Sequence, residues 1–318
     1  MKRINYEDHA PLIEALLKRQ DELNITHLAK ELCVTLDLEY TDSLRRGLSG
    51  YLRVNMTVGS KPTSIKPKVL VFDLETSPIK AWAWGVWQQN IMPEQIIQDW
   101  HLISWAAKWL FEDEVMSDVL TPDEILRGDD SRIAASLWDL MDEADVIIAH
   151  NGDKFDIPST NTRFIINGLG IPSSYISIDT LKIDRRMFRI VHNKLDYVNK
   201  VLGLDQKKKT GWEVWEKCMA GDQAALDYMA EYNREDVRIL EQNYLITRPY
   251  IKNHPNLGLF MDSNDLMCPT CTSTDVHEIG LYTTTSGQFP EYRCNECGST
   301  SHGRFNQVKK DRILPNAR

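Results

Sequence analysis

The chain has 318 residues, of which 42% are hydrophobic, and a formal net charge of −9. This length allows one large domain with one or two small ones, and the acidic balance argues against a uniformly basic nucleic-acid-binding coat. No apolar run approaches the ~20 residues of a membrane helix, and the charged N-terminal stretch does not resemble a secretory signal. We therefore expect a cytoplasmic protein without a membrane partner, whose six cysteines are reduced unless a metal holds them.

Residues 1–60 are predicted to form a small helical domain. Helical periodicity runs through residues 10–32 with a short break, and a third helix is expected to begin at Thr41 or Asp42, with Arg45 and Arg46 on its polar side. Three short helices in this span resemble a helix-turn-helix module, and a helical domain with no DNA role fits the pattern equally well. Pro, Ser and Lys residues mark a linker over residues 61–67.

Residues 68–255 are predicted to form an α/β domain that begins with a buried strand. Residues 68–72 are mostly apolar and β-branched or aromatic, which is typical of such a strand. Asp73 and Glu75 follow it, and side chains two residues apart on a strand point to the same face. Like charges close to a core repel each other and are poorly solvated, so a neutralising partner is expected. The alternative is that the strand ends at Phe72 and both acids lie in water.

Alternating aromatic residues predict two further strands, over residues 81–90 and 99–111, that pair with the first strand. The tryptophans of this region are interpreted as core residues, with stacking on nucleobases as the alternative: Trp82, Trp84, Trp87, Trp100, Trp105 and Trp109. Helices and strands then alternate, which indicates an α/β sandwich. Helices are predicted over 129–144, 194–204 and 221–246, and strands over 145–150 and 175–180.

Further acids stand at the ends of predicted elements. Asp156 follows the strand 145–150 and precedes a helix, where a simple N-cap aspartate is the alternative interpretation. Tyr232 and Asp236 are four residues apart in a helical segment and share one face, and the alternative is a Tyr–Asp pair at the solvent boundary. A site for two metal ions requires carboxylates from several elements, which these acids supply together with the pair after the first strand.

The order of these motifs resembles one enzyme family. Asp-x-Glu at a strand end, Asn-x-x-x-Phe-Asp after a second strand and Tyr-x-x-x-Asp on a late helix are similar to the DEDD 3′–5′ exonucleases, which include proofreading domains of DNA polymerases. The tyrosine at position 232 implies the tyrosine branch, DEDDy, and the overall pattern looks like the stand-alone phage or bacterial type. The resemblance covers roughly residues 66–250 and implies a ribonuclease H-like mixed sheet flanked by helices.

The resemblance also implies site residues, cofactors and substrate. Asp73, Glu75, Asp156 and Asp236 would bind two Mg²⁺ or Mn²⁺ ions, and Tyr232 would orient the attacking water. Residues that would contact the terminal nucleotide are Thr76, Asn151 and Phe155. The implied reaction releases nucleoside 5′-monophosphates from the 3′ end of single-stranded nucleic acid, DNA rather than RNA, in a bacterial cell or a phage-infected host.

Two other functions fit the same residues. One is an exoribonuclease that trims RNA, because the same four carboxylates serve both substrates. The other is a catalytically inactive adaptor that binds nucleic acid, which the complete set of carboxylates argues against. A polymerase or another replication or repair protein is the expected protein partner.

The C-terminal part predicts a zinc ribbon over residues 266–303. Two C-x2-C pairs are separated by 22 residues, and each pair can present two thiolates to one tetrahedral Zn²⁺: Cys268, Cys271, Cys294 and Cys297. Four protein ligands leave no open position, so one structural zinc is expected, with paired disulfides as the alternative. The segment between the pairs is predicted to be a β-hairpin.

The other two cysteines, Cys33 and Cys218, are predicted to be core residues because they stand in helical patterns. Residues 304–318 form a basic tail, interpreted either as an arm that contacts phosphates or as a solvated tail. Its basic residues are Arg304, Lys309, Lys310, Arg312 and Arg318.

Overall fold

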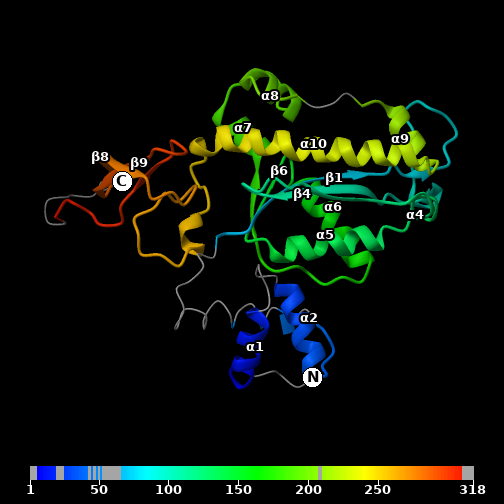
Figure 1. The fold of residues 1–318 in the computed structure, drawn as a ribbon. Coiled ribbons are helices and arrows are strands. Elements are labelled where there is room, and N and C mark those ends of the chain that lie inside the picture. Colours follow the sequence, from blue (N-terminus) through cyan, green and yellow to red (C-terminus); the bar gives the residue numbers. More distant parts are fainter. Residues whose placement is uncertain are drawn as a thin grey trace.

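The computed structural model describes residues 6–18, 25–41, 44–45, 48, 51, 66–206 and 210–309 (Figure 1). The strands are β1 (Val69–Thr76), β2 (Lys80–Ala81), β3 (Ile96–Gln98), β4 (Leu102–Trp109), β5 (Met116–Val119), β6 (Val146–Ala149), β7 (Ile176–Asp179), β8 (Val276–Thr284), β9 (Gly287–Cys294) and β10 (Thr300–His302). The α-helices are α1 (Ala10–Leu17), α2 (Ile25–Thr35), α4 (Pro122–Arg127), α5 (Ser131–Glu143), α6 (Asp156–Ile166), α7 (Thr180–Met187), α8 (Leu195–Leu202), α9 (Trp212–Met219) and α10 (Gln223–Thr247). Among the helices described, none combines the length and the apolar character that crossing a lipid bilayer requires.

The largest sheet in the described part of the chain has five strands in the order β5-β4-β1-β6-β7. β1 pairs antiparallel with β4 and parallel with β6, and β7 pairs parallel with β6. The central place of β1 follows from its sequence, because residues 69–72 are all buried and leave neither face of the strand to solvent. The expected α/β class, a mixed sheet flanked by helices, is confirmed.

Helices cover both faces of this sheet (Figure 1). α5 and α6 lie on one face, and α10 lies on the other together with α7. Successive residues of β1 alternate between the faces, so Leu70 and Phe72 join one hydrophobic cluster and Val71 joins another. Asp73 and Glu75 therefore lie on the face of Val71, which α10 covers.

β1 carries both acids within its paired length. It continues past Phe72 to Thr76 because β4 pairs with it along this whole stretch, Asp73 lying opposite Ala106. Asp73 and Glu75 are half-buried on the strand instead of lying in water after its end. The strand predicted over residues 99–111 is confirmed as β4.

Residues 81–90 do not form the predicted strand. Only β2 and β3 pair there, and the segment between them is a loop held by local bonds such as the one from Trp82 N to Gln95 O, 2.9 Å. The two edges of β1 are occupied by β4 and β6. Residues 81–90 therefore have no free edge of β1 with which to pair, despite their alternating aromatic residues.

The core interpretation of the tryptophans is confirmed for two residues and wrong for three. Trp105 and Trp109 of β4 are buried against the helices. Trp100 is half-buried. The loop between β2 and β3 exposes 74–99% of its three indoles: Trp82, Trp84 and Trp87.

The N-terminal helices have a hydrophobic cluster of their own, in which α1 and α2 pack with Leu44 and Leu48. Thr41 Oγ1 accepts a hydrogen bond from Leu44 N at 3.2 Å, as expected of a helix that begins at Thr41. Most of the third helix, including Asp42 and Arg46, lies outside the described residues. The resemblance to a helix-turn-helix module remains a prediction.

Arg45 does not lie on a polar helix face. It is buried, pairs with Asp142 of α5, and donates from Nη2 to Ser173 Oγ at 3.2 Å. Ser173 N also donates to Asp142 Oδ1, at 2.6 Å. A buried carboxylate requires a hydrogen-bonded cation. Arg45 therefore attaches the N-terminal helices to α5 and is not available to a phosphate backbone.

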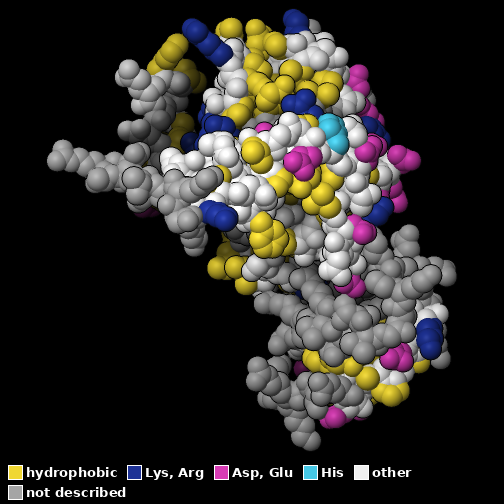
Figure 2. Space-filling model, turned by 90° about the vertical axis from the view of Figure 1, so that its left-hand side faces the viewer, with side chains coloured by type: hydrophobic (Ala, Val, Ile, Leu, Met, Phe, Trp, Pro, Cys, Tyr) yellow, Lys and Arg dark blue, Asp and Glu magenta, His cyan; other side chains and the backbone are white. Residues whose placement is uncertain are grey.

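The C-terminal sheet, β10-β9-β8, lies beyond the C-terminal end of α10 (Figure 1). β8 and β9 form the predicted hairpin, and Leu257 N donates to Pro269 O at 2.7 Å, which ties the sheet to the segment after α10. On the face of the molecule in Figure 2, acidic and basic side chains of the described residues are interspersed. Residues 61–65 of the predicted linker and residues 310–318 of the predicted tail lie outside the described residues.

Asp184 of α7 gives a prediction about stability. Its side chain is fully buried, neither carboxylate oxygen has a hydrogen-bond partner among the described residues, and burial together with nearby Asp179 raises its pKa from 3.8 to about 7. Because the folded pKa is the higher one, the protein loses stability as pH rises from about 4 through 7. Asp184→Asn removes this loss, so its free energy of unfolding relative to wild type should increase by about 2 kcal/mol between pH 5 and pH 8.

Urea unfolding of both proteins at the two pH values measures this difference. Comparing the two pH values cancels whatever the asparagine itself costs in the core. A relative stability that does not change with pH would contradict the assignment of a neutral carboxyl at Asp184.

Candidate functional site

Two acids on β1 and one on α10 meet on the face of the sheet that α10 covers. Ligand oxygens of Asp73, Glu75 and Asp236 all lie within 4.8 Å of one another. The residues opposite the first two on β4 are small, Ala106 and Ser104, which leaves room above the strand for α10 to approach. Asp236 is 1% exposed, and Asp73 and Glu75 are half-buried, so water reaches the three carboxylates only in part.

Asp156 lies against this cluster from a third element. It is the first residue of α6, is 2% exposed, and accepts a hydrogen bond from Leu74 N of β1. The N-cap of α6 is Phe155, so Asp156 is not the simple N-cap that was the alternative. Its Oδ1 has no hydrogen-bond partner among the described residues. Burial raises the pKa of Asp156 well above its usual range, and the nearby carboxylates of Asp73 and Glu75 raise it further.

The acidic residues as a set fit divalent cations. Repulsion and burial both disfavour several ionised carboxylates here unless a positive charge joins them. All donors are oxygens from rigid elements, which hard cations such as Mg²⁺ and Mn²⁺ prefer. A buried oxygen that lacks a partner in the protein is the kind of atom that a metal ion satisfies.

Asn233 of α10 is a positioning residue that sequence reasoning missed. Its Nδ2 donates to Asp73 Oδ2 at 2.7 Å, and its Oδ1 accepts from Ser104 Oγ at 3.2 Å. The side chain is fully buried, so this chain of bonds fixes which way the Asp73 carboxylate points. The available signal was an asparagine inside a long helix, directly after Tyr232 of the third motif.

Asp179, at the end of β7, is a second residue that was missed. Its carboxylate accepts from Asn151 N at 3.0 Å and from Asp153 N at 3.4 Å, and it also caps α7. Asn151 has a positive φ of 69°, and a Cβ on Gly152 would meet Ala149 Cβ at 2.5 Å. The loop before Asp156 is therefore tightly turned, and Asp179 holds it in that shape.

Comparison with known families adds an independent observation. Residues 119–245 match a family described as the RNase_H superfamily. The match includes Asp156, Tyr232 and Asp236, and the sheet has the mixed pairing expected of that fold. The central domain is ribonuclease H-like.

No match was found among curated protein sequences. Among solved structures, the chain is similar to the family B DNA polymerase from the hyperthermophilic archaeon Pyrobaculum calidifontis, with 19% identity and a TM-score of 0.43. The similarity covers 60% of this chain and 26% of the polymerase chain. This chain thus corresponds to about a quarter of that protein's length.

The remaining predicted site residues of the ribonuclease H-like domain differ in exposure. Tyr232 is buried in the core one turn before Asp236. Thr76 and Asn151 are half-buried. Phe155 is 42% exposed.

The cysteine cluster lies at the other end of α10 from the helix α9, outside the ribonuclease H-like domain (Figure 1). The Sγ atoms of Cys268, Cys271, Cys294 and Cys297 lie within 4.8 Å of one another. The closest pairs are 3.6 Å apart, so the alternative of paired disulfides is not what the structure shows. Cys33 and Cys218 are buried, as predicted.

The chemistry of the four thiols fits a metal ion. A hydrogen bond from Cys271 lowers the pKa of Cys268 to about 5, whereas the pKa of Cys271, which keeps the proton, is raised. Four sulfurs this close cannot all be thiolates without a cation among them. A positive φ of 77° at Gly298 allows the tight turn after the last cysteine.

The contact between Asn233 and Asp73 gives a second prediction. Asn233→Ala frees the Asp73 carboxylate to rotate, so the affinity of the acidic cluster for Mn²⁺ should fall about tenfold or more. Asn243→Ala, a matched control, removes a buried asparagine of the same helix that contacts Asn199 and no acid of the cluster. Calorimetric titration with Mn²⁺ measures both variants. Equal affinities for wild type and Asn233→Ala would contradict the positioning role.

Proposed function

We propose that this protein is a metal-dependent 3′–5′ exonuclease of the DEDDy type that hydrolyses single-stranded nucleic acid, DNA in preference to RNA. The observation that carries the proposal is the convergence of Asp73, Glu75 and Asp236 within 4.8 Å, with the buried Asp156 against them. The three sequence motifs thereby meet at one place on a ribonuclease H-like sheet. Placing four acids together, two of them buried, destabilises the fold, and an adaptor without catalytic activity would gain nothing in return.

Two Mg²⁺ or Mn²⁺ ions are the proposed cofactors, held by the four carboxylates. When bound, such ions activate the attacking water and stabilise the charge that develops on the phosphoryl and leaving oxygens. The residues of the chain supply the geometry: Asn233 orients Asp73, and Leu74 N holds Asp156 against the edge of β1.

Tyr232 is proposed to orient the attacking water. It stands one helical turn before Asp236, which places both side chains on the same side of α10. A phenol with a pKa near 10 in water is a poor base at neutral pH, so its role is to hold the water by a hydrogen bond. Thr76, Asn151 and Phe155 are proposed to contact the terminal nucleotide.

The flanking parts are proposed to serve binding. The division into a helical domain (1–60), a linker (61–67), a nuclease domain (68–255), a ribbon (266–303) and a tail (304–318) remains part of this proposal. One structural Zn²⁺ would hold the ribbon, which together with the N-terminal helices would grip nucleic acid or a replication or repair protein such as a polymerase. The proposed location is the cytoplasm.

Digestion of matched DNA and RNA oligonucleotides, labelled at the 5′ end, tests the proposal. With Mg²⁺ or Mn²⁺ we expect DNA to shorten stepwise from its 3′ end, faster than RNA, and EDTA to stop the reaction. Faster digestion of RNA would favour the exoribonuclease alternative. Binding of both strands without digestion by either metal would favour the adaptor.

A further inference from the structure

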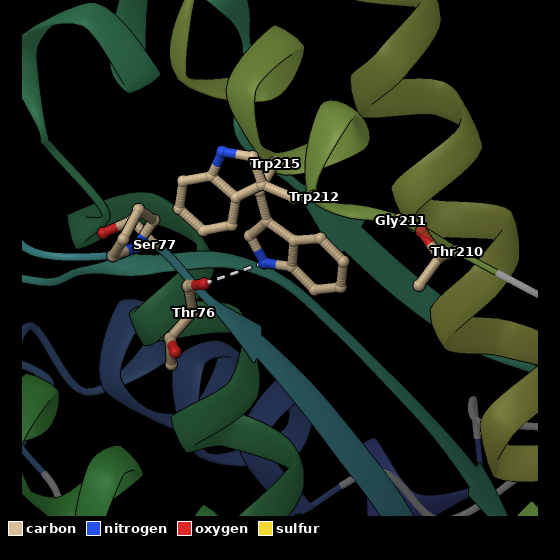
Figure 3. A pocket seen from close by; sticks show the side chains of 7 residues that line it. Thr76, Ser77, Thr210, Gly211, Trp212 and Trp215 are labelled. Atoms are coloured by element: carbon tan, nitrogen blue, oxygen red, sulfur yellow. Dashed lines mark hydrogen bonds between the residues drawn. The ribbon is translucent and has the colours of Figure 1, made fainter.

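A cavity of about 440 Å³ opens at the end of β1 (Figure 3). Residues 76–78 line one side of it, and residues 210–212 with Trp215 of α9 line the other. Thr76 lines the cavity and directly follows Glu75 of the acidic cluster, so the Cα atoms of these two residues are about 3.8 Å apart. The cavity therefore begins at the residue next to that cluster on β1.

Two tryptophans, Trp212 and Trp215, supply the aromatic surface of the cavity. Both indoles project from α9 toward the end of β1 (Figure 3). Trp215 packs against the main hydrophobic cluster and donates from Nε1 to Thr76 O at 3.3 Å, so its position is fixed. Trp212 is 65% exposed, which leaves a flat aromatic surface open at the mouth of the cavity.

The polar groups of the cavity select the class of ligand. The described residues that line it include two indoles and three hydroxyl groups. Thr210 Oγ1 is buried and has no hydrogen-bond partner among the described residues, so it is available to a polar ring edge. A flat, neutral ring with donors and acceptors on its edge matches both the indole surface and this hydroxyl.

We propose that this cavity binds the base of one of the two nucleotides that flank the scissile phosphate, with Trp212 as the stacking surface. This inference rests on the proposed exonuclease function and adds a base-binding site to it. Stacking accepts every base because each has a π face, so the site would sense the presence of a base more than its identity.

The test compares oligonucleotides that lack one base. Single strands carry an abasic residue at the 3′-terminal position, at the second position, or at the eighth as a control. Binding is measured by fluorescence anisotropy in EDTA, and kcat/KM for hydrolysis is measured in Mn²⁺. For wild type, one of the first two abasic strands should bind about five- to hundredfold more weakly and be hydrolysed correspondingly more slowly, whereas the eighth position should have no effect.

Variants of the tryptophans assign the effect to the cavity. Trp212→Ala should bind the ordinary strand as weakly as wild type binds the abasic one and should no longer discriminate, while Trp212→Phe keeps part of the discrimination. Trp84→Ala is the matched control, because it removes an indole that is 99% exposed and lies outside the cavity. The proposal is overturned if Trp212→Ala discriminates like wild type, or if wild type is indifferent to both abasic positions.

The two readouts separate this inference from the function on which it rests. If wild type and Trp212→Ala hydrolyse DNA equally well and discriminate equally, the exonuclease function is supported and the base-binding site is refuted. Wild type that binds ordinary strands more tightly than abasic ones in EDTA, but hydrolyses neither in Mn²⁺, would refute the exonuclease function. The base-binding site would then belong to a protein that only binds nucleic acid.

Discussion

Asp73→Asn and Asp236→Asn are each expected to lower the rate of DNA hydrolysis by about a thousandfold or more without unfolding the protein. Each change removes one negative charge from the three carboxylates whose oxygens lie within 4.8 Å of one another. The site should therefore bind divalent cations more weakly and position them less well for catalysis. A thousandfold loss corresponds to about 4 kcal/mol of transition-state stabilisation, which is in the range supplied by metal ions in such sites.

The same variants should be more stable than wild type in metal-free buffer. The Asp73 carboxylate raises the pKa of the buried Asp156, so neutralising position 73 relieves repulsion in the folded state. Added Mn²⁺ should reverse the order, because it stabilises wild type by binding the folded protein more tightly than it binds the variants. Thermal unfolding with and without Mn²⁺ measures both effects.

Asp227→Asn is the matched control for Asp236→Asn. Asp227 lies on the same helix, exposed to solvent, where it accepts a hydrogen bond from Gln223 Nε2 at 2.8 Å. We expect this variant to digest DNA like wild type. Wild-type rates in Asp73→Asn or Asp236→Asn would show that the acidic cluster is not the active site.

Removal of the proposed zinc ion is expected to unfold the ribbon and to leave the central domain folded. Structural zinc sites contribute about 10–16 kcal/mol of binding energy in small domains, so a ribbon without metal should unfold. Cys271→Ser removes one of the four ligands and should reduce the zinc content from about one ion per chain to nearly none. Amide hydrogen exchange over residues 266–303 should then become fast, while the strands β1, β4 and β6 keep their protection.

Elemental analysis and hydrogen exchange on the same samples test this result. Cys218→Ser is the control, because Cys218 is buried in the core of the central domain and does not belong to the cluster. Full zinc content in Cys271→Ser, or a purified wild-type chain that holds no zinc and still protects the ribbon, would contradict the assignment.

The sequence was sufficient to predict which acids share a face, because the periods of strands and helices depend only on neighbouring residues. The two-residue period of a strand places Asp73 and Glu75 on one face, and the four-residue spacing on a helix does the same for Tyr232 and Asp236. The C-x2-C spacing likewise predicted a four-cysteine cluster. In each case the chemistry depends on neighbours along the chain, and only the meeting of the three acidic motifs required a fold.

The positioning residues were not predictable in this way. Asn233 and Asp179 act on Asp73 and Asn151, and the register of α10 against β1 and of β7 against β6 decides those contacts. Arg45 was assigned to a polar face because its helix was considered alone, whereas a buried partner on α5 determines its place. Tertiary packing overrides the local pattern at these positions.

The loop between β2 and β3 shows a further limit of pattern reasoning. A segment with alternating aromatic residues can join a sheet only where a strand edge is free, and β4 and β6 already occupy both edges of β1. Trp82, Trp84 and Trp87 are therefore exposed on this loop and do not lie in the core. The cavity beside α9 could not be foreseen either, because Trp212 and Thr76 meet only in the folded chain.

A digestion of end-labelled DNA tests whether the acidic cluster is the active site of a 3′–5′ exonuclease. A single-stranded DNA labelled at its 5′ end is incubated with Mn²⁺ and either wild type or Asp236→Asn, and both the ladder and the released nucleotides are analysed. We predict that wild type shortens the strand one nucleotide at a time from the 3′ end and releases nucleoside 5′-monophosphates, while Asp236→Asn leaves it intact. Internal cuts, shortening from the 5′ end or equal digestion by both proteins would contradict the account.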